Sequence, residues 1–289
     1  MRRCVRCETS LNGDGWDCPA CSFAPAIVDG VPILAPELAR GNPEDADYGY
    51  EELHRAEAIH FWFTNRSRLI AWSARRYFPD AKSFFDVGCG TGGVLHALRT
   101  MVPGVRLAGA DALLAGLAFA RRQLPEMAFA QVDIRRLPYD REFDLIGAFD
   151  VLEHLDDDQQ ALREMYRSTT IGGGLIVTVP QHPFLWSALD DYSHHRRRYT
   201  RPRMVGAIER AGFVVERATS FMTLTLPVQW ASRLRKQNLA TLNPAAEMRL
   251  NAVVNSILGV LCGVERSAIV AGVSLPVGGS LLVVARRTS

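Results

Sequence analysis

The stretch Phe84-Phe85-Asp86-Val87-Gly88-Cys89-Gly90-Thr91-Gly92-Gly93 decides the fold of this chain. An apolar run ends in an acid, a glycine turn follows at once, and Val94-Leu95-His96-Ala97-Leu98 predicts the first turns of a helix. A strand, a glycine loop and a helix N-terminus in this order form a nucleotide-type binding site. The glycines allow the backbone to pass close to a ligand and to adopt positive φ.

Asp86 indicates which ligand this loop faces. Gly88, Gly90 and Gly93 also satisfy the dinucleotide pattern GxGxxG, but that match alone is weak. A dinucleotide presents a pyrophosphate, which a carboxylate beside the loop would repel. S-adenosylmethionine (SAM) carries a sulfonium and an α-ammonium group instead, and an acid fits these cations. The remaining interpretation is an ordinary tight turn in a parallel sheet.

Asp86, Gly88, Gly90 and Gly92 match, position by position, the acid-x-Gly-x-Gly-x-Gly first motif of the class I SAM-dependent methyltransferases. The chain therefore resembles that family, in its type 11/12-like branch. The resemblance implies an α/β fold with a seven-stranded, doubly wound, Rossmann-like sheet. It also implies that the loop, with Cys89 in it, lies against the cofactor.

Length and composition set the outer limits. A chain of 289 residues with 48% hydrophobic residues fits one large domain and a small one, and its net charge of +2 gives no global attraction to nucleic acid. No apolar leader follows Met1, and no stretch reaches the roughly 20 apolar residues of a membrane span, so we expect a cytoplasmic protein. The nearest run, 252–264, ends at Glu265-Arg266 and is either a buried helix or a membrane-surface or lipid-binding face.

Four of the six cysteines, Cys4, Cys7, Cys18 and Cys21, form two CxxC knuckles near the N-terminus. Paired knuckles match tetrahedral thiolate zinc, whereas two disulfides would be unusual in a reducing cytoplasm. The sequence 27–37 then resembles the tail of small zinc ribbons that precede some rRNA guanine methyltransferases and many small-molecule methyltransferases. We expect a zinc ribbon over 1–37, either propping the main domain or contacting substrate.

Residues 38–82 are expected to be a linker, 38–48, and a helical region over about 49–78. Three adjacent aromatics, at 61–63, either pack on the core or form a lid over the cofactor. By resemblance, a basic residue just before the first strand holds the SAM carboxylate. Arg66 is the first candidate for that role and Arg68 the second.

From 83 to 289 the chain alternates strand and helix patterns, as a doubly wound SAM-binding domain should. Helices are expected between the first five strands, and Thr200 and Gly212 bound a further helix over 201–211. The last strand is expected as a late edge strand. The seven expected strands cover 83–87, 105–110, 127–131, 143–149, 174–180, 213–221 and 279–286.

Acids stand at successive strand ends, where an open α/β sheet binds its ligand. Asp111, followed by Ala112, closes the second strand, and Asp133, followed by Ile134, closes the third. The resemblance implies that Asp111 accepts both ribose hydroxyls, that Asp133 accepts from the adenine amino group, and that Ile134 lies beside the ring. Each acid taken alone could be a helix cap, but acids at three successive strand ends disfavour that interpretation.

The fourth strand ends in Asp150-Val151-Leu152-Glu153-His154, where methyl donor and acceptor should meet. Asp150, Glu153 and His154 are the catalytic candidates, and His154 could take a proton from a hydroxyl acceptor. Glu153 and His154 could instead only hold the loop. Ubiquinone-pathway O-methyltransferases carry E-x-x-E-H here and bind a divalent cation, so D-x-x-E-H leaves a cation site as an alternative.

The segment after the fifth strand has the patterns W-x-x-x-D and H-x-R-R-Y, which resemble methyltransferases of polysaccharide, lipid and natural-product pathways. Its cations could hold a phosphate, a carboxylate or a nucleotide-linked sugar, or could pair with Asp190 and Asp191 on a solvated face. The acceptor-side candidates are His182, Trp186, Tyr192, His194, His195, Arg197 and Tyr199.

An apolar, helical insertion is expected over about 222–278 and is interpreted as a cap over the acceptor, a homodimer surface or a face for a lipidic substrate. The sequence predicts a SAM-dependent methyltransferase that modifies a small-molecule, saccharide or lipid-linked acceptor by O-methylation. An rRNA base methyltransferase is the second interpretation, and a non-enzymatic SAM-binding or zinc-ribbon adaptor is the third. The insertion residues behind this prediction are Trp230, Leu234, Leu239, Leu242, Leu250, Val253, Val254, Ile257 and Leu258.

Overall fold

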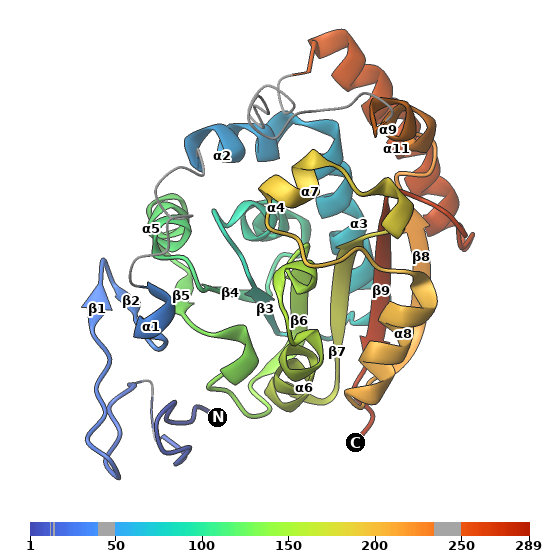
Figure 1. The fold of residues 1–289 in the computed structure, drawn as a ribbon. Coiled ribbons are helices and arrows are strands. Elements are labelled where there is room, and N and C mark those ends of the chain that lie inside the picture. The colour runs from blue at the N-terminus through green and yellow to red at the C-terminus, as the bar shows by residue number, and fades with distance from the viewer. Residues whose placement is uncertain (12, 14, 40–49, 234–249) are drawn as a thin grey trace.

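The computed structural model describes residues 1–11, 13, 15–39, 50–233 and 250–289. A seven-stranded sheet runs through the centre of the molecule in the order β5-β4-β3-β6-β7-β9-β8 (Figure 1). Neighbours from β5 to β7 are parallel, and β9 is antiparallel to both β7 and β8. The strands are β3 (Ser83–Val87), β4 (Arg106–Asp111), β5 (Ala128–Gln131), β6 (Phe143–Phe149), β7 (Thr169–Pro180), β8 (Val214–Phe221) and β9 (Ser280–Arg286).

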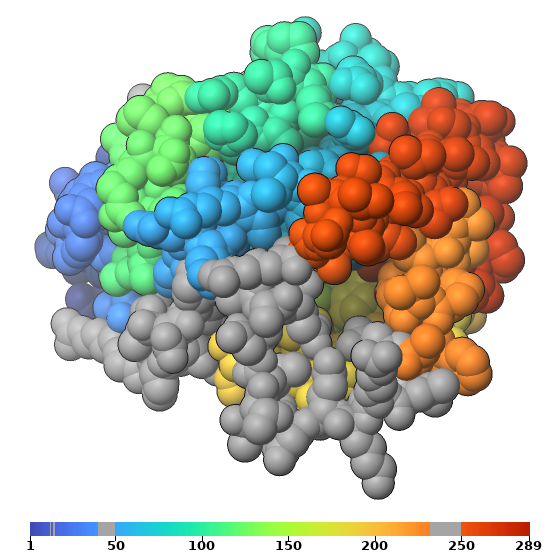
Figure 2. Space-filling model, turned by 90° about the horizontal axis from the view of Figure 1, so that it is seen from above, coloured from blue at the N-terminus to red at the C-terminus, as the bar shows by residue number. Residues whose placement is uncertain are grey.

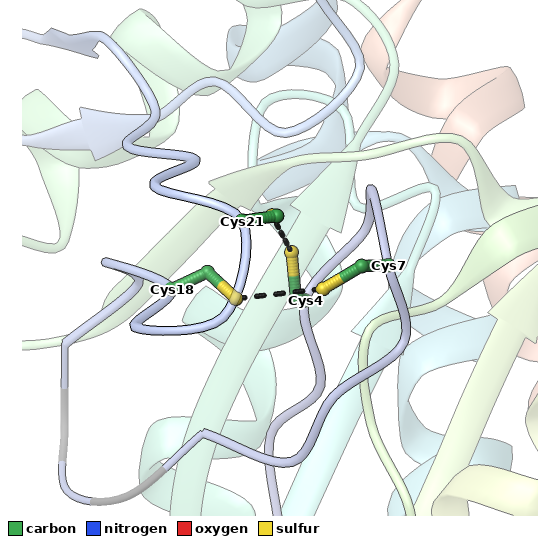
Figure 3. Close-up of side chains that lie close together, drawn as sticks. All are labelled: Cys4, Cys7, Cys18 and Cys21. Carbon is green, nitrogen blue, oxygen red and sulfur yellow. Dashed lines mark hydrogen bonds between the residues drawn. The ribbon is translucent and has the colours of Figure 1, made fainter.

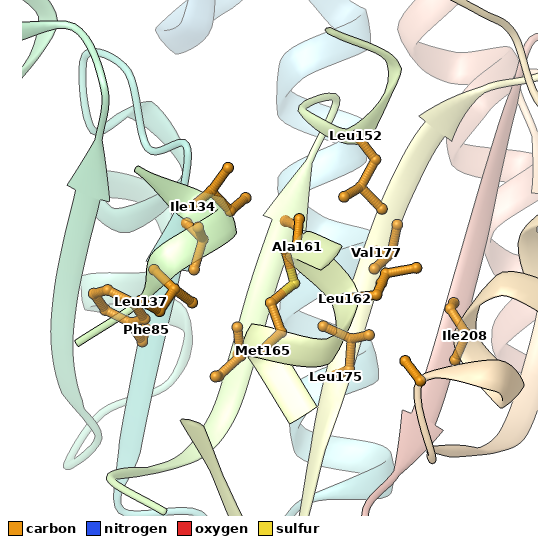
Figure 4. Packing of buried hydrophobic residues seen from close by; sticks show 14 of the residues in the cluster. Phe85, Ile134, Leu137, Leu152, Ala161, Leu162, Met165, Leu175, Val177 and Ile208 are labelled. Atoms are coloured by element: carbon orange, nitrogen blue, oxygen red, sulfur yellow. The ribbon is translucent and has the colours of Figure 1, made fainter. Parts of the chain in front are cut away.

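Helices cover both faces of this sheet, and successive residues of a strand point to opposite faces. Phe84 packs on the face under α3 (Phe61–Tyr77), α4 (Gly93–Met101) and α5 (Leu114–Gln123). Phe85 packs on the other face, where α6 (Asp158–Ser168) and α8 (Arg201–Arg210) bury Leu162, Met165 and Ile208 (Figure 4). The expected doubly wound α/β architecture is confirmed.

The last strand differs from the expectation. β9 lies between β7 and β8, so β8 is the edge strand. The side chains from Leu281 to Ala285 have no exposed surface, and a strand buried on both faces needs a partner on each side. β7 also begins at Thr169, five residues earlier than expected, because Thr169 pairs with Phe143 ahead of an irregularity in the ladder.

The crossover between β5 and β6 also differs from the expected helix. Only a single 3-10 turn, η2 (Ile134–Arg136), connects these strands. Thr200 does cap α8, by accepting a hydrogen bond from the backbone N–H of Arg203, and Gly212 follows the helix with a φ of 108°.

The N-terminal segment lies along the free edge of β5. A short hairpin, β1 (Ile27–Val28) and β2 (Val31–Pro32), leads to α1 (Pro36–Ala39). The N–H of Leu34 donates to the carbonyl of Gln131 at 2.9 Å, and the Gln131 side chain bonds both backbone groups of Ala35. This pairing covers an edge that would otherwise expose unpaired backbone groups. The expected linker 38–48 lies largely outside the described residues.

The expected helical region before the first strand is present as α2 (Tyr50–Ile59) followed by α3. The insertion contains α9 (Leu226–Arg233) and α11 (Ala252–Val270), and Leu234, Leu239 and Leu242 lie outside the described residues. α11 continues past Glu265-Arg266, where the apolar run of the sequence was expected to end. By length and composition α11 could cross a membrane, contrary to the expectation from the sequence. Only 17% of its apolar window is buried among the residues that the structure describes, which does not fit the buried-helix interpretation.

Candidate active site

The glycine loop joins β3 to α4 at the carboxyl end of the sheet. Gly88 has a φ of 77°, and a Cβ there would lie 2.4 Å from a methyl group of Val151, so only glycine fits. A Cβ on Gly90 would meet nothing within 4 Å, which leaves space for a ligand beside the loop. The N–H of Gly90 donates to Asp111 at 2.8 Å and ties the loop to the end of β4.

Asp86 lies under the loop with 2% of its surface exposed, and its Oδ1 has no hydrogen-bond partner. Burial raises the pKa of Asp86 to about 7, although the Arg66 guanidinium opposes the shift. An unpaired buried carboxylate oxygen is uncommon in folded proteins. A cationic ligand on the loop would satisfy it.

Glu57, on α2, is a second acid at this loop, half-buried, and the sequence analysis missed it. Its Oε2 accepts from the Thr91 hydroxyl at 2.6 Å, and a Cβ on Gly93 would lie 2.2 Å from its carboxyl carbon. Burial raises the pKa of Glu57. No local motif marks Glu57, because the fold alone brings α2 over the N-terminus of α4.

Arg66 reaches the end of β6 from α3 and pairs with Asp150. Its guanidinium lies 4.4 Å from the Trp62 ring centroid, so the adjacent aromatics hold the cation. Thr178 also donates to Asp150 Oδ2, at 3.1 Å. Arg66 Nε is buried without a partner and remains available to a carboxylate ligand. Arg68, the second candidate, is exposed.

Asp150 itself has a φ of 57°, a left-handed conformation that non-glycine residues rarely adopt. Such strain is concentrated at functional sites. The turn η3 (Leu152–His154) follows and brings Glu153 and His154 under the loop after β7. Both oxygens of the fully buried Glu153 lack partners, and burial, with Asp150 nearby, raises its pKa well above the ordinary value.

His154 and His195 meet edge to face, with ring centroids 4.7 Å apart. Burial, and then the neighbouring His195, lowers the pKa of His154 to about 4, so its imidazole is neutral near pH 7. Ligand atoms of Glu153, His154 and His195 all lie within 4.8 Å of one another. The cluster that the fold assembles thus contains His195 in addition to Glu153 and His154, while Asp150 is held by Arg66.

Asp190 orients His195 from behind. It is 1% exposed, accepts from the ring Nδ1 of His195 at 2.9 Å and pairs with Arg198 at 2.7 Å. Burial alone would raise its pKa, but the bonds from His195 and Arg198 hold the pKa of Asp190 well below its ordinary value. A carboxylate on Nδ1 fixes the tautomer that leaves Nε2 as a proton acceptor. Asp190 appeared in the sequence only as an alternative partner for nearby arginines.

Two acids are expected to contact the nucleoside, and both have hydrogen-bond partners within the protein. Asp111 accepts from the N–H groups of Gly90 and Leu113, and Asp133 caps η2 and pairs with Arg135 at 2.9 Å. Both acids therefore also act as caps, and their contacts to ribose and adenine remain predictions.

The other residues expected beside the cofactor pack against the protein core or bond to other residues. The Cys89 sulfur faces the core, since a Cβ on Gly109 would approach it to 2.8 Å. Ile134 is 9% exposed within the core, and the Ala112 carbonyl accepts from the side chain of Gln131. Cys89 can thus contact a cofactor only through its backbone.

The acceptor-side segment is held mainly by internal pairs. Arg197 pairs with Asp158 at 2.9 Å, and Tyr199 is fully buried with its hydroxyl donating to Asp158 at 2.6 Å. Tyr199 is therefore a structural residue and does not fit the expected acceptor contact. His182 has a buried, unpartnered Nε2 and stacks on Phe184, which is 64% exposed.

The other acceptor-side candidates lie on or after α7 (Ala188–Tyr192) or just before it. The indole N–H of Trp186 donates to Asp191 at 2.9 Å, and Tyr192 is 37% exposed. His194 adopts a φ of 52° in the turn that delivers His195. The segment therefore offers His182, Trp186 and Tyr192 as accessible side chains on the acceptor side.

The four N-terminal cysteines converge in a separate cluster (Figure 3). Sulfurs of Cys4 and Cys21 lie 3.6 Å apart, those of Cys7 and Cys18 lie 3.5 Å apart, and no disulfide links them. Zinc–thiolate bonds of about 2.3 Å require sulfur separations of about 3.8 Å in a tetrahedron, so these residues fit zinc. A cavity of about 230 Å³ beside the ribbon is lined by Trp16, Arg106 and Phe143.

The fold is that of the class I SAM-dependent methyltransferases. Residues 85–177 match the family model described as Methyltransferase domain. The trans-aconitate 2-methyltransferase of Variovorax paradoxus is 33% identical over 110 residues, which cover 38% of this chain and 42% of that protein. The ubiquinone biosynthesis O-methyltransferase of Pseudomonas paraeruginosa is 26% identical, over 58% of this chain and 84% of that protein.

A structural neighbour agrees with this fold. Phosphoethanolamine N-methyltransferase 2 of Haemonchus contortus, solved in complex with S-adenosyl-L-methionine, superposes with a TM-score of 0.57. The two sequences are 15% identical, and the superposition covers 86% of this chain and 59% of the neighbour's chain. The chain spans about half the length of the trans-aconitate relatives that it matches, so these likenesses define the domain and its fold.

Proposed function

We propose that this protein transfers a methyl group from SAM to a hydroxyl or carboxylate oxygen of a small-molecule, saccharide or lipid-linked acceptor. The observation that carries the proposal is the buried Asp86, whose Oδ1 has no hydrogen-bond partner, beneath a glycine loop with open space at Gly90. The names of the two sequence relatives, a trans-aconitate methyltransferase and a ubiquinone O-methyltransferase, support a small acceptor.

The site residues take distinct parts in this reaction. Asp86 and Glu57 attract the cationic donor, and Asp111 accepts from the ribose. Arg66 holds Asp150 in position and offers its free Nε to the donor carboxylate. Sulfonium is already a good leaving group, so correct placement of donor and acceptor supplies most of the rate.

A hydroxyl acceptor must also lose its proton. We propose that the His154–His195 pair takes it, because His154 is neutral and Asp190 fixes the tautomer of His195. His154 follows β6, where the acceptor is expected, and His195 reaches it from the segment after α7. A carboxylate acceptor would need no base, so dependence on this pair reports the acceptor class.

A divalent cation held by Glu153, His154 and His195 is the second candidate. The two unpartnered oxygens of Glu153 favour it, because a buried carboxylate normally has a partner. Such an ion would orient and polarise an acceptor oxygen. We also propose a structural zinc at Cys4, Cys7, Cys18 and Cys21.

Isothermal titration of the purified protein with SAM tests the central proposal. We expect saturable binding of SAM, and a loss of roughly 1–3 kcal/mol in Asp111→Ala, whose charge-assisted hydrogen bonds are removed. Binding of NADH but not SAM would overturn it. Salt-sensitive binding of rRNA fragments, with methyl incorporation into them, would favour the second interpretation of the sequence, an rRNA methyltransferase.

A further inference from the structure

The helix α11 is built with its apolar side outward. Val253, Ile257, Val260 and Val264 repeat at helical spacing and are between 56% and 67% exposed. With Val254 and Leu261 they form what we call the outer face of α11. The helix lies at the surface of the molecule (Figure 2). A surface helix normally turns such a stripe toward the core.

Three polar residues of α11, Asn255, Glu265 and Arg266, face inward instead, while Ser256 and Ser267 are exposed. Asn255 accepts from the N–H of Phe61 at 2.8 Å and donates to the carbonyl of Ile59 at 2.9 Å. Glu265, which is 5% exposed, accepts from the N–H groups of Thr223 at 2.7 Å and Leu224 at 2.9 Å. These bonds fix which side of the helix faces the protein.

Arg266 completes this inner side by bonding Asn65 on α3. Gly259 lies where a Cβ would be 3.8 Å from the Cβ of Phe61, so the two helices are in close contact. Rotating α11 to bury its valines would leave Glu265 and Arg266 without their partners, at a large desolvation cost. The outward apolar face is therefore a fixed property of the fold.

A bilayer surface fits this face better than water does. The helix has a mean hydropathy of 1.6 over its apolar window, and its single acid, Glu265, is turned inward. Nearby, α9 adds Val228 and Trp230, which are 60% and 53% exposed. Tryptophan is enriched where proteins meet the headgroup region of a membrane.

A cation accompanies the apolar face. Arg68, on α3, is exposed, and within the described residues it forms no ion pair. It lies near Arg266, whose pKa is lowered by burial and then by the charge of Arg68. An uncompensated cation beside apolar surface suits anionic lipid headgroups.

We propose that the protein docks peripherally on anionic membranes through the outer face of α11, with Arg68 directed at the headgroups. The helix lies in the plane of the membrane and does not span it, because Asn255, Glu265 and Arg266 anchor it to the protein. Docking places α3, which carries Arg66, next to the lipid. The proposal does not depend on methyl transfer.

Flotation of the full chain with lipid vesicles tests this. We expect binding to vesicles of phosphatidylcholine and phosphatidylglycerol, and weaker binding to phosphatidylcholine alone. Ile257→Gln combined with Val260→Gln should reduce the partition coefficient roughly tenfold or more, because apolar insertion is lost. Arg68→Gln should reduce binding to the anionic vesicles about fivefold and leave binding to neutral vesicles unchanged.

The matched control is Ile171→Gln combined with Val214→Gln, two residues of similar exposure (58% and 51%) at the starts of β7 and β8. It should bind vesicles like the wild type. Wild-type protein that stays unbound overturns the proposal. So does a dimer that the α11 substitutions dissociate, which makes this face a self-interface. A fall in the unfolding temperature of the α11 variant without vesicles also overturns it, because the chain itself then covers the face.

Discussion

Arg66 and Asp150, separated by 84 positions in the sequence, form a partly buried ion pair that joins α3 to the end of β6. The pair fixes a left-handed Asp150 at the point where donor and acceptor should meet. The helical segment before the sheet is thereby part of the site and not only a support for it.

Removing one partner of this pair should be costly. We expect Arg66→Ala to lower the free energy of unfolding by about 3 kcal/mol, because the partly buried Asp150 then loses its cation and keeps only the Thr178 hydroxyl as a partner. SAM affinity should fall as well, since Nε is lost. Denaturant unfolding and titration calorimetry measure both effects. Arg68→Ala, an exposed arginine on the same helix, is the control, and an equal effect there would contradict the role of the pair.

The ionisation of Asp86 should have opposite effects on the stability of the free protein and on SAM binding. The folded-state pKa of Asp86, about 7, lies above the ordinary value of 3.8, so the stability of the free protein falls as pH rises between these values. Asp86→Asn should remove this penalty and raise the unfolding temperature by a few degrees at pH 8. Calorimetric scans across this pH range check the sign.

The same ionisation should govern SAM binding. Only the charged form of Asp86 attracts the donor cation, so affinity should fall as the pH drops below about 7. Asp86→Asn should bind SAM weakly at every pH. A wild-type affinity that does not change between pH 8 and 6 would show that Asp86 is not a ligand for the cation.

Substitution of either residue of the His154–His195 pair should lower the rate of methyl transfer and leave SAM affinity unchanged. His154→Ala or His195→Ala should lower turnover of a hydroxyl acceptor by about 10²–10⁴. Asp190→Asn should have a smaller effect and shift the pH–rate profile, because it acts through His195. EDTA distinguishes a general base from a cation site. A general base needs no cation, so activity should persist. If Glu153, His154 and His195 hold a cation, the protein should lose activity in EDTA and regain it with Mg²⁺. Full activity in both alanine variants would leave the pair a structural role.

The ribbon predicts one zinc per chain in protein purified without added metal. Elemental analysis should find it, and Cys4→Ser combined with Cys18→Ser should abolish it, since two of four thiolates are lost. Cys89→Ser, at a buried cysteine outside the cluster, should retain the metal. Zinc that survives the double substitution would place the ligands elsewhere.

The sequence by itself determined the class of fold, the glycine loop and the acids at the strand ends, because these features are local. An apolar run, a turn and a helix start need only neighbouring residues to be recognised. The same locality explains why the CxxC knuckles predicted a cluster that the fold brings together. The position of β9 was not local, since it depends on which strands bury its two faces.

Only the tertiary structure decided which side chains share the site and which faces stay exposed. Glu57 and Asp190 carry no motif, and they reach Thr91 and His195 because packing places their elements there. Tyr199 looked like a ligand in the sequence but is buried in the core. The direction of α11 follows from the partners of Asn255 and Glu265, because hydrogen bonds formed after folding fix which side of an apolar helix faces outward.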